Sequence, residues 1–420
     1  MRRAHTRALQ SLLLAVSMLA VVALLVASPI RATAQAAKAG HGAPANLPPI
    51  EALQLQRTRV FSLPAPNGFR GFTECDSNGD AFARFAFLVG NPMHLVESPF
   101  ISEVIPDEKR IVEYAVPRLS ESKYPHAKQT SYGVSPGGKL YALISTQQRT
   151  SKGKPVSAPR YYVERFRDNG ASGPITPILP PAGVSRWYAY QIAPFPGGEF
   201  LIAGQSTAAE GRPAPGSWGP LTAVYDSAGR FVSEVTLPQD VTNNFKELST
   251  GKRKTAAGAE AQTSKAPQDF PAAISEGDIL SGPDGNVWIL RASDPIRLYA
   301  VDSVGQVVKH FQLSPPYPGL IPFAFGIARS GDIFLDFLRL PAYLRLPASN
   351  PGAPSKAPEG PSQLIALLNT ISGRFDTLYT LPKVRNAFLG TITCGDGNGG
   401  FLYLGSSAGS RLAVFDFAAH

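Results

Sequence analysis

The sequence predicts an all-β protein, a six-bladed β-propeller made of four-stranded antiparallel blades, and three observations lead to this fold. Short alternating apolar runs dominate the chain, and no long stretch shows the i, i+3, i+4, i+7 pattern of an amphipathic helix. A Gly-containing hairpin phrase recurs along the chain, and a second strand–turn–strand phrase follows its copies. Two such hairpins supply the four strands of one propeller blade.

The first phrase is a turn ending in Gly, then a polar or small residue and an apolar strand. Glycine suits such a turn because the backbone there needs a positive φ, which costs other residues energy. Its six copies are "NGDAFARF" at Gly79, "GGKLYALI" at Gly138, "GGEFLIAG" at Gly198, "DGNVWILR" at Gly285, "SGDIFLDF" at Gly331 and "NGGFLYLG" at Gly399.

The second phrase supplies the outer hairpin of a blade. Its copies are "YYVERFRDNGASGPITPILP" (161–180), "LTAVYDSAGRFVSEVTLP" (221–238), "RLYAVDSVGQVVKHFQLSP" (297–315) and "LIALLNTISGRFDTLYTLP" (364–382). The sixth unit is one strand short at its end, while "LQRTRVFSLPAP" (55–66) resembles the outer-strand phrases. We therefore expect the N-terminal strand to complete the C-terminal blade, which closes the ring without an open edge.

The chain is expected to hold one folded domain, residues 53–420, behind a signal peptide (1–34) and a flexible leader (35–52). A basic start, the apolar run from Ser11 to Ala27 and the small-x-small pattern at Ala32-Thr33-Ala34 predict cleavage after Ala34. Removing this segment lowers the formal net charge from +9 to about +5. The sequence thus predicts a secreted or periplasmic protein. The alternative is an uncleaved membrane anchor, since the run approaches the length that spans a bilayer.

The fourth repeat unit carries a family resemblance. "GPDGNVWIL" (282–290) followed by "RLYAVDSVGQVV" (297–308) resembles the repeats of the NHL-repeat, SMP-30/gluconolactonase and streptogramin-lyase-like propellers. The other repeats are further from that consensus. The resemblance implies the propeller fold and says little about chemistry, because one fold hosts many functions.

Four long insertions are expected to project from one rim of the propeller. If the strands of a blade are named A to D from the centre outward and alternate in direction, the B–C and D–A connections emerge on the same face. Residues 147–159, 206–219 and 341–361 are B–C loops on this reading, and residues 239–270 are a D–A loop. Insertions gathered on one face are typical of a binding side. The alternative is that they are low-complexity extensions, which surface loops tolerate.

Aromatic residues at or near the same rim are the candidate binding residues. They are Trp187, Tyr188, Tyr190, Trp218 and Tyr317. Aromatic side chains at a wet surface suit stacking on a ligand or docking of a partner, although packing between blades is the alternative for each of them. The sequence thus favours a monomeric module that binds a protein, peptide or glycan. Nucleic acid is disfavoured, because no basic stripe is interleaved with aromatic residues.

The alternative function is a metal-assisted lactonase or lyase with its site in the central channel, and enzyme activity stays open. Glu74 and Asp278 lie on predicted innermost strands, with Asp76 and Asp396 at the turns. Such an enzyme would need at least three of these carboxylates to converge on one ion. The histidines show no metal-ligand spacing, and the sequence has no nucleotide-binding motif, so no cofactor is expected.

The two cysteines of the chain, Cys75 and Cys394, occupy the same place in the repeat, at the end of an inner strand. They belong to blades one and six, which become neighbours when the ring closes. An exported chain meets an oxidising compartment, where a disulfide persists. The sequence therefore leaves two alternatives, a Cys75–Cys394 disulfide or two buried reduced thiols.

Overall fold

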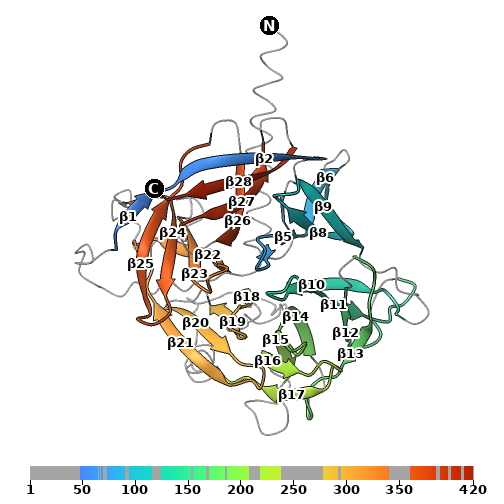
Figure 1. Cartoon of the computed structure of the whole chain (residues 1–420). Coiled ribbons are helices and arrows are strands. Elements are labelled where there is room, and N and C mark those ends of the chain that lie inside the picture. The colour runs from blue at the N-terminus through green and yellow to red at the C-terminus, as the bar shows by residue number, and fades with distance from the viewer. Residues whose placement is uncertain are drawn as a thin grey trace, which may run out of the picture.

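The computed structural model confirms the all-β six-bladed propeller: six sheets of antiparallel strands stand around a central axis (Figure 1). None of the described stretches forms a helix, and so none contains a helix long and apolar enough to cross a membrane. The predicted signal peptide and the 239–270 loop lie outside the described residues. The structure describes residues 48–64, 66, 68–69, 73–89, 94–115, 124–152, 155–166, 170–184, 187–207, 218–237, 278–291, 295–339, 360–384, 388–395, 399–407 and 411–419.

Each of the first three blades runs from an inner strand to an outer one in chain order. These strands are, for blade one, β4 (Glu74–Cys75), β5 (Ala81–Ala83), β8 (Phe100–Ile105) and β9 (Arg110–Ala115); for blade two, β10 (Lys128–Val134), β11 (Leu140–Thr146), β12 (Arg160–Arg165) and β13 (Ile175–Ile178); for blade three, β14 (Trp187–Pro194), β15 (Phe200–Thr207), β16 (Trp218–Tyr225) and β17 (Phe231–Glu234).

The other three blades follow the same order, except that the last takes its outer strand from the N-terminal part of the chain. They are blade four, β18 (Asp278–Ser281), β19 (Val287–Arg291), β20 (Ile296–Val301) and β21 (Val307–Leu313); blade five, β22 (Leu320–Ile327), β23 (Ile333–Arg339), β24 (Gln363–Asn369) and β25 (Arg374–Thr380); and blade six, β26 (Phe388–Gly395), β27 (Phe401–Ser406), β28 (Arg411–Ala418) and β2 (Gln54–Pro64).

The hairpin turns have the backbone that the repeat phrase predicts. All six turn glycines, from Gly79 to Gly399, have φ between 77° and 94°. This is the left-handed region, where a Cβ would be strained and glycine is favoured. In blade one, Asp76 also accepts hydrogen bonds from the backbone N–H groups of Asn78 and Asp80, at 2.9 and 3.0 Å. The recurring phrase is therefore the A–B hairpin of each blade.

Ring closure by the N-terminal strand is confirmed. β2 pairs antiparallel with β28, so that Thr58 lies opposite Phe415 (Figure 1). One expectation about the leader needs correction: its last three residues, Ile50–Ala52, form strand β1, which pairs parallel with β25. Leu53 then donates its backbone N–H to Thr380 at 2.9 Å and buries its side chain. The leader therefore ends before residue 50.

Blade one contains an element that the sequence did not reveal. A hairpin of β6 (Phe85–Val89) and β7 (His94–Glu97) is inserted in its B–C connection. It forms a three-stranded sheet with β3 (Gly68–Phe69), which precedes β4 in the chain. The apolar run after Gly79 suggests one strand, but Arg84 divides it. Its Nε donates to the backbone oxygen of Ser98 at 3.1 Å, and its guanidinium pairs with Glu97 at 3.2 Å. Like three of the four predicted insertions, this hairpin leaves the blade between strands B and C.

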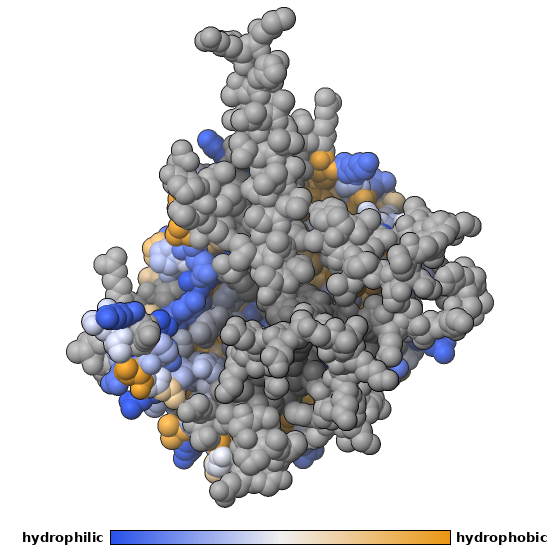
Figure 2. Space-filling view, turned by 180° about the vertical axis from the view of Figure 1, so that it is seen from behind, coloured by the Kyte–Doolittle hydropathy of each residue, from blue (hydrophilic) through white to orange (hydrophobic). Residues whose placement is uncertain are grey.

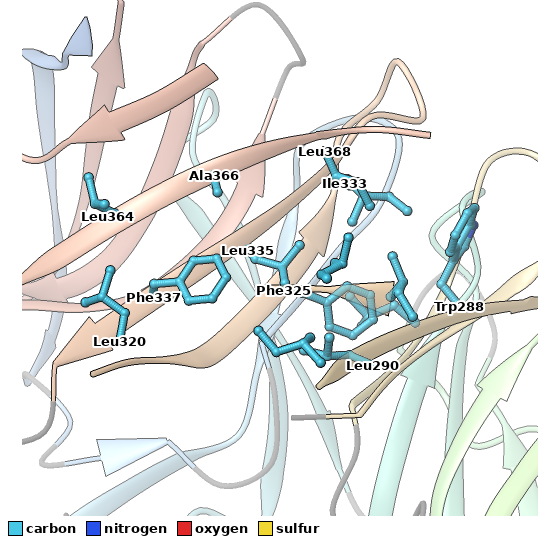
Figure 3. Packing of buried hydrophobic residues seen from close by; sticks show 14 of the residues in the cluster. Trp288, Leu290, Leu320, Phe325, Ile333, Leu335, Phe337, Leu364, Ala366 and Leu368 are labelled. Carbon is cyan, nitrogen blue, oxygen red and sulfur yellow. The ribbon is translucent and has the colours of Figure 1, made fainter. Parts of the chain in front are cut away.

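The core lies between neighbouring blades. Figure 3 shows the cluster between blades four and five, where Leu290, Phe325 and Leu335 lie close together. Trp288 extends this cluster, and its indole nitrogen donates to Asp284 at 3.3 Å. Similar clusters fill the spaces between other neighbouring blades, such as two and three or five and six. Burial of such apolar surface is the main driving force for folding, so each blade is stabilised by its neighbours.

Candidate functional site: a cleft between blades two and three

A cleft of about 460 Å³ opens between blades two and three. One wall comes from the start of β10, the end of β11 and the start of β12; the other comes from the start of β14. Inner strands begin, and B strands end, at the rim that carries the B–C and D–A connections. The cleft therefore lies on the rim where the sequence predicts the long insertions.

Tyr188 and Tyr190 form the blade-three wall. They alternate along β14 with the buried Trp187 and Ala189, as the two-residue period of a strand requires. The two tyrosines are 38% and 37% exposed, and their rings are nearly parallel, with centroids 6.4 Å apart and planes 8° apart. The Tyr190 hydroxyl donates to Gln205 Oε1 at 3.3 Å. Two parallel rings thus stand in a position that a ligand can reach.

Trp187, the first aromatic residue of the same run, lies in the core. It is 5% exposed, meets the Tyr161 ring edge-on with a centroid distance of 4.8 Å, and stacks on Tyr225. The indole therefore packs between blades two and three, and it cannot contact a ligand in the cleft. Tyr161 does line the cleft, and its hydroxyl is hydrogen-bonded to the backbone of Ala189. Burial raises the pKa of Tyr161, so this phenol is neutral at physiological pH.

The blade-two wall carries His126, Lys128 and Arg149. Lys128 begins β10, and Arg149 lies in the predicted B–C insertion 147–159. None of the described residues that line the cleft is an Asp or Glu. The cleft therefore presents cationic groups on one wall and aromatic rings on the other.

The described part of the 147–159 loop is held by hydrogen bonds rather than left as a loose extension. Val156 donates its N–H to Gln148 O at 2.9 Å, and Gln147 Nε2 donates to Ser157 O at 3.1 Å. Arg149 and Pro155 form an isolated antiparallel bridge. The loop base is fixed to the preceding connection, because Gln147 donates its N–H to Pro125 O at 3.0 Å. The described part of the loop, which presents Arg149, is thus held by hydrogen bonds before any ligand arrives.

The other aromatic candidates are not part of this cleft. Tyr317 lies in the D–A connection between β21 and β22, half-buried against the core between blades four and five. Its ring lies against Gly360, at the end of the next B–C insertion. Trp218 begins β16, but its side chain and most of the 206–219 and 341–361 insertions lie outside the described residues. The structure therefore brings together Tyr188 and Tyr190, and it leaves Tyr317 two blades away.

The described carboxylates that the sequence predicts in the central channel lie outside this cleft. Glu74 is 6% exposed, and its Oε2 accepts the backbone N–H of Val134 at 2.7 Å. It lines a cavity of only about 20 Å³ together with Ser281 and Ile327. The side chains of Asp278 and Asp396 lie outside the described residues. Within the part of the chain that the structure describes, no three His, Cys, Asp or Glu side chains are grouped so that they could hold a metal ion.

Cys75 and Cys394 are joined by a disulfide in the structure. Their Cα atoms are 5.5 Å apart, inside the range that a disulfide allows. The bond links β4 of blade one to β26 of blade six. Of the two alternatives left by the sequence, the structure has the bonded one, at the seam where the ring closes.

No family model and no curated protein matches this chain. Solved structures with a similar arrangement include a protein of unknown function from Dyadobacter fermentans, with 11% identity over 88% of this chain and 100% of that one, at a TM-score of 0.44. A luciferin-regenerating enzyme has 11% identity over 86% and 95%, at 0.42. A protein of unknown function from Bacteroides caccae has 14% identity over 74% and 81%, at 0.32. Likenesses at this level assign no function.

Proposed function

We propose that this propeller is an exported binding module that holds a protein, peptide or glycan in the cleft between blades two and three. The observation that carries the proposal is the pair of parallel rings of Tyr188 and Tyr190, each more than a third exposed in a cleft of about 460 Å³. Ligand sites are typically concave, with aromatic walls and a few polar groups. A buried pair would indicate packing, whereas an accessible pair in a cleft is typical of recognition.

Two further features support this proposal. The walls are supplied by a B–C insertion and by strand ends on the face that carries the other insertions, which is where repeat proteins commonly bind. In the view of Figure 2, the visible described residues show hydrophobic side chains only in small separate groups among hydrophilic ones. A broad apolar interface is therefore not evident on the described part of that surface, which fits a module that works as a monomer.

Export is part of the proposal. It rests on the apolar segment from Ser11 to Ala27 and the cleavage pattern at Ala32-Thr33-Ala34. The Cys75–Cys394 disulfide supports it, because disulfides persist in oxidising compartments and are rare in the cytosol. The repeat phrase of the fourth blade remains the basis for placing the chain near the NHL-type propellers. N-terminal sequencing of protein recovered outside the cytoplasm should begin at Gln35.

The binding proposal is tested by probing glycan and peptide arrays with three forms of the mature protein. These are the wild type, the double variant Tyr188→Ala/Tyr190→Ala and the control Phe231→Ala. Phe231 is 40% exposed and begins β17, so it lies on the opposite face, beside a C–D turn. We expect wild type and Phe231→Ala to retain the same ligands and the tyrosine double variant to lose them. Binding that survives the double variant, or a wild type that retains nothing, contradicts the proposal.

A further inference from the structure

We infer that the occupant of the cleft is an acidic glycan, an oligosaccharide whose sugars carry carboxylate groups. The inference rests on the proposed function and names its ligand class. It draws on three properties of the cleft: its charge, the hydrogen-bonding capacity of its lining, and its pair of exposed rings.

The charge of the cleft favours an anionic ligand. Lys128 and Arg149 line it with His126, and no described lining residue is acidic. The loop that supplies Arg149 is basic throughout: residues 147–160 include four basic side chains and no Asp or Glu, namely Arg149, Lys152, Lys154 and Arg160. A cleft with charges of one sign attracts ligands of the opposite sign and raises their local concentration. Arginine also matches the planar, two-oxygen geometry of a carboxylate.

The neutral lining groups suit sugar hydroxyls. The Thr130 hydroxyl already donates to Leu143 O at 3.1 Å, and the Ser145 hydroxyl donates to Lys128 O at 3.3 Å. Each hydroxyl has one proton but two lone pairs, so both oxygens remain able to accept hydrogen bonds. A sugar hydroxyl can donate to these oxygens, while a carboxylate accepts from the cations. A ligand that carries both hydroxyl and carboxylate groups therefore uses both the hydroxyl oxygens and the cations of the cleft.

The shape of the apolar surface distinguishes a sugar from an acidic peptide. Pro159 and Ala189 are the aliphatic members of the described lining, so that part of the cleft offers no deep aliphatic pocket for an anchoring side chain. Its aromatic lining consists of Tyr161, Tyr188 and Tyr190, and the last two present nearly parallel rings. An aromatic face carries partial negative charge and attracts positively polarised edges. The C–H groups on one side of a pyranose ring provide such an edge.

The cleft is also organised before binding. The hydrogen bonds of the 147–159 loop hold the cationic wall, and the Tyr190–Gln205 hydrogen bond at 3.3 Å supports the aromatic wall. Less side-chain and loop entropy is then lost when a ligand is bound. This favours binding of a chain with many weak contacts, such as an oligosaccharide.

The test uses isothermal titration calorimetry of the mature protein with a defined panel of probes. The probes are oligosaccharides of galacturonate, of mannuronate and guluronate, and of glucuronate with N-acetylglucosamine. Each is paired with its carboxyl-reduced, neutral counterpart, and a poly-glutamate peptide of similar charge is added. We expect at least one acidic oligosaccharide to bind, its neutral counterpart to bind at least 10-fold more weakly, and the affinity to fall at high salt because screening weakens ion pairs.

Three variants locate the binding. We expect Lys128→Gln/Arg149→Gln to weaken binding of the acidic sugar at least 10-fold, and Tyr188→Ala/Tyr190→Ala to abolish it. Lys383→Gln is the control: Lys383 is exposed in the D–A connection after β25, so a positive charge is removed on the same rim but away from the cleft. It should bind as the wild type does. Unchanged thermal melting of each variant shows that it is folded.

The outcomes separate this inference from the proposed function. If neutral and acidic sugars bind equally, or if poly-glutamate binds more tightly than every sugar, the acidic-glycan inference is wrong while the binding module stands. Failure of all the acidic sugars also overturns the inference, and the array experiment then decides whether the cleft binds anything. If Lys383→Gln weakens binding as much as the cleft variants do, the attraction is a general charge effect, and the assignment of the binding site to the cleft is wrong.

Discussion

Arg59 of the N-terminal strand and Asp416 of the C-terminal strand form an ion pair across the ring closure, with Arg59 Nη1 2.6 Å from Asp416 Oδ1. The same guanidinium reaches blade one, where its Nη2 lies 2.8 Å from Asp107 Oδ1. The Arg59 side chain is 8% exposed, that of Asp416 is 19% exposed, and that of Asp107 is 83% exposed. One buried arginine thus joins both ends of the propeller domain to the first blade.

Replacing Arg59 should weaken the closure. Burial raises the pKa of Asp416, and Arg59 opposes this effect, so loss of Arg59 should raise the pKa of Asp416 further. Removing one member of a buried pair leaves an uncompensated charge. We expect Arg59→Met to lower the free energy of unfolding by about 2–4 kcal/mol, measured by urea denaturation. Asp107→Asn is the control and should cost less than about 1 kcal/mol, because Asp107 is exposed. Equal costs would show that the buried pair does not stabilise the closure.

The disulfide should stabilise the same seam. It joins residues separated by 319 positions, so it restricts a very large loop in the unfolded chain. The chain-entropy model gives a stabilisation on the order of 5 kcal/mol for such a loop, and measured values are often smaller. We expect Cys75→Ser/Cys394→Ser to unfold at lower urea concentration than the oxidised wild type. Reductant should destabilise the wild type and leave the double variant unchanged. If a thiol reagent labels both cysteines of the purified, unreduced chain after denaturation, the bond is not formed.

Asp336 should make the stability of the protein depend on pH. It lies on β23, 1% exposed, and accepts hydrogen bonds from Gln363 at 3.1 Å and Tyr403 at 3.4 Å. Burial raises its pKa from 3.8 to about 7. The folded state then binds a proton that the unfolded state has lost, so stability falls as pH rises from about 4 to 7 and is constant above that. Between pH 5.5 and 8 the loss from this group is about 2 kcal/mol, at about 1.4 kcal/mol per pKa unit.

Asp336→Asn isolates this contribution. The amide keeps an acceptor for Gln363 and does not titrate, so the variant should lose less stability than the wild type between pH 5.5 and 8. Denaturant unfolding at both pH values gives the comparison. Part of the decrease in unfolding free energy with rising pH should remain in the variant, because burial also raises the pKa of Asp80 to about 6. Identical slopes for variant and wild type would mean that Asp336 is ionised in the folded protein at both pH values.

The sequence predicts the fold well where one local phrase determines one local structure. Each turn glycine fixes a hairpin, and repetition of the hairpin fixes the blades. Two elements were not predicted from the sequence, because they form through contacts with partners outside their own local pattern. Ile50–Ala52 is too short to show a strand pattern, and it becomes a strand by pairing with β25, more than three hundred residues away. The hairpin of β6 and β7 follows from the contacts of Arg84 with Glu97 and Ser98, which no spacing indicates.

The cleft could be predicted only in part. Tyr188 and Tyr190 stand out in "RWYAYQ" as aromatic residues near the rim, but their partners on the other wall lie about forty to sixty positions earlier. Lys128 and Arg149 reach the cleft only because blades two and three pack side by side. A local pattern thus identifies one wall, and the tertiary arrangement supplies the other.

Buried and exposed side chains alternate along β14, and the last prediction compares two adjacent aromatic residues of this strand. Trp187 is 5% exposed and packs on Tyr161 and Tyr225, so Trp187→Ala leaves a large cavity between two blades. We expect a loss of about 3–5 kcal/mol in unfolding free energy, measured by urea denaturation. Tyr188, one residue later, is 38% exposed, and Tyr188→Ala should cost less than about 1 kcal/mol. Since both substitutions remove an aromatic side chain from neighbouring positions, most of the difference reflects burial. If both variants are equally destabilised, Tyr188 is a packing residue, and the cleft lacks an accessible ring that the proposed binding role requires.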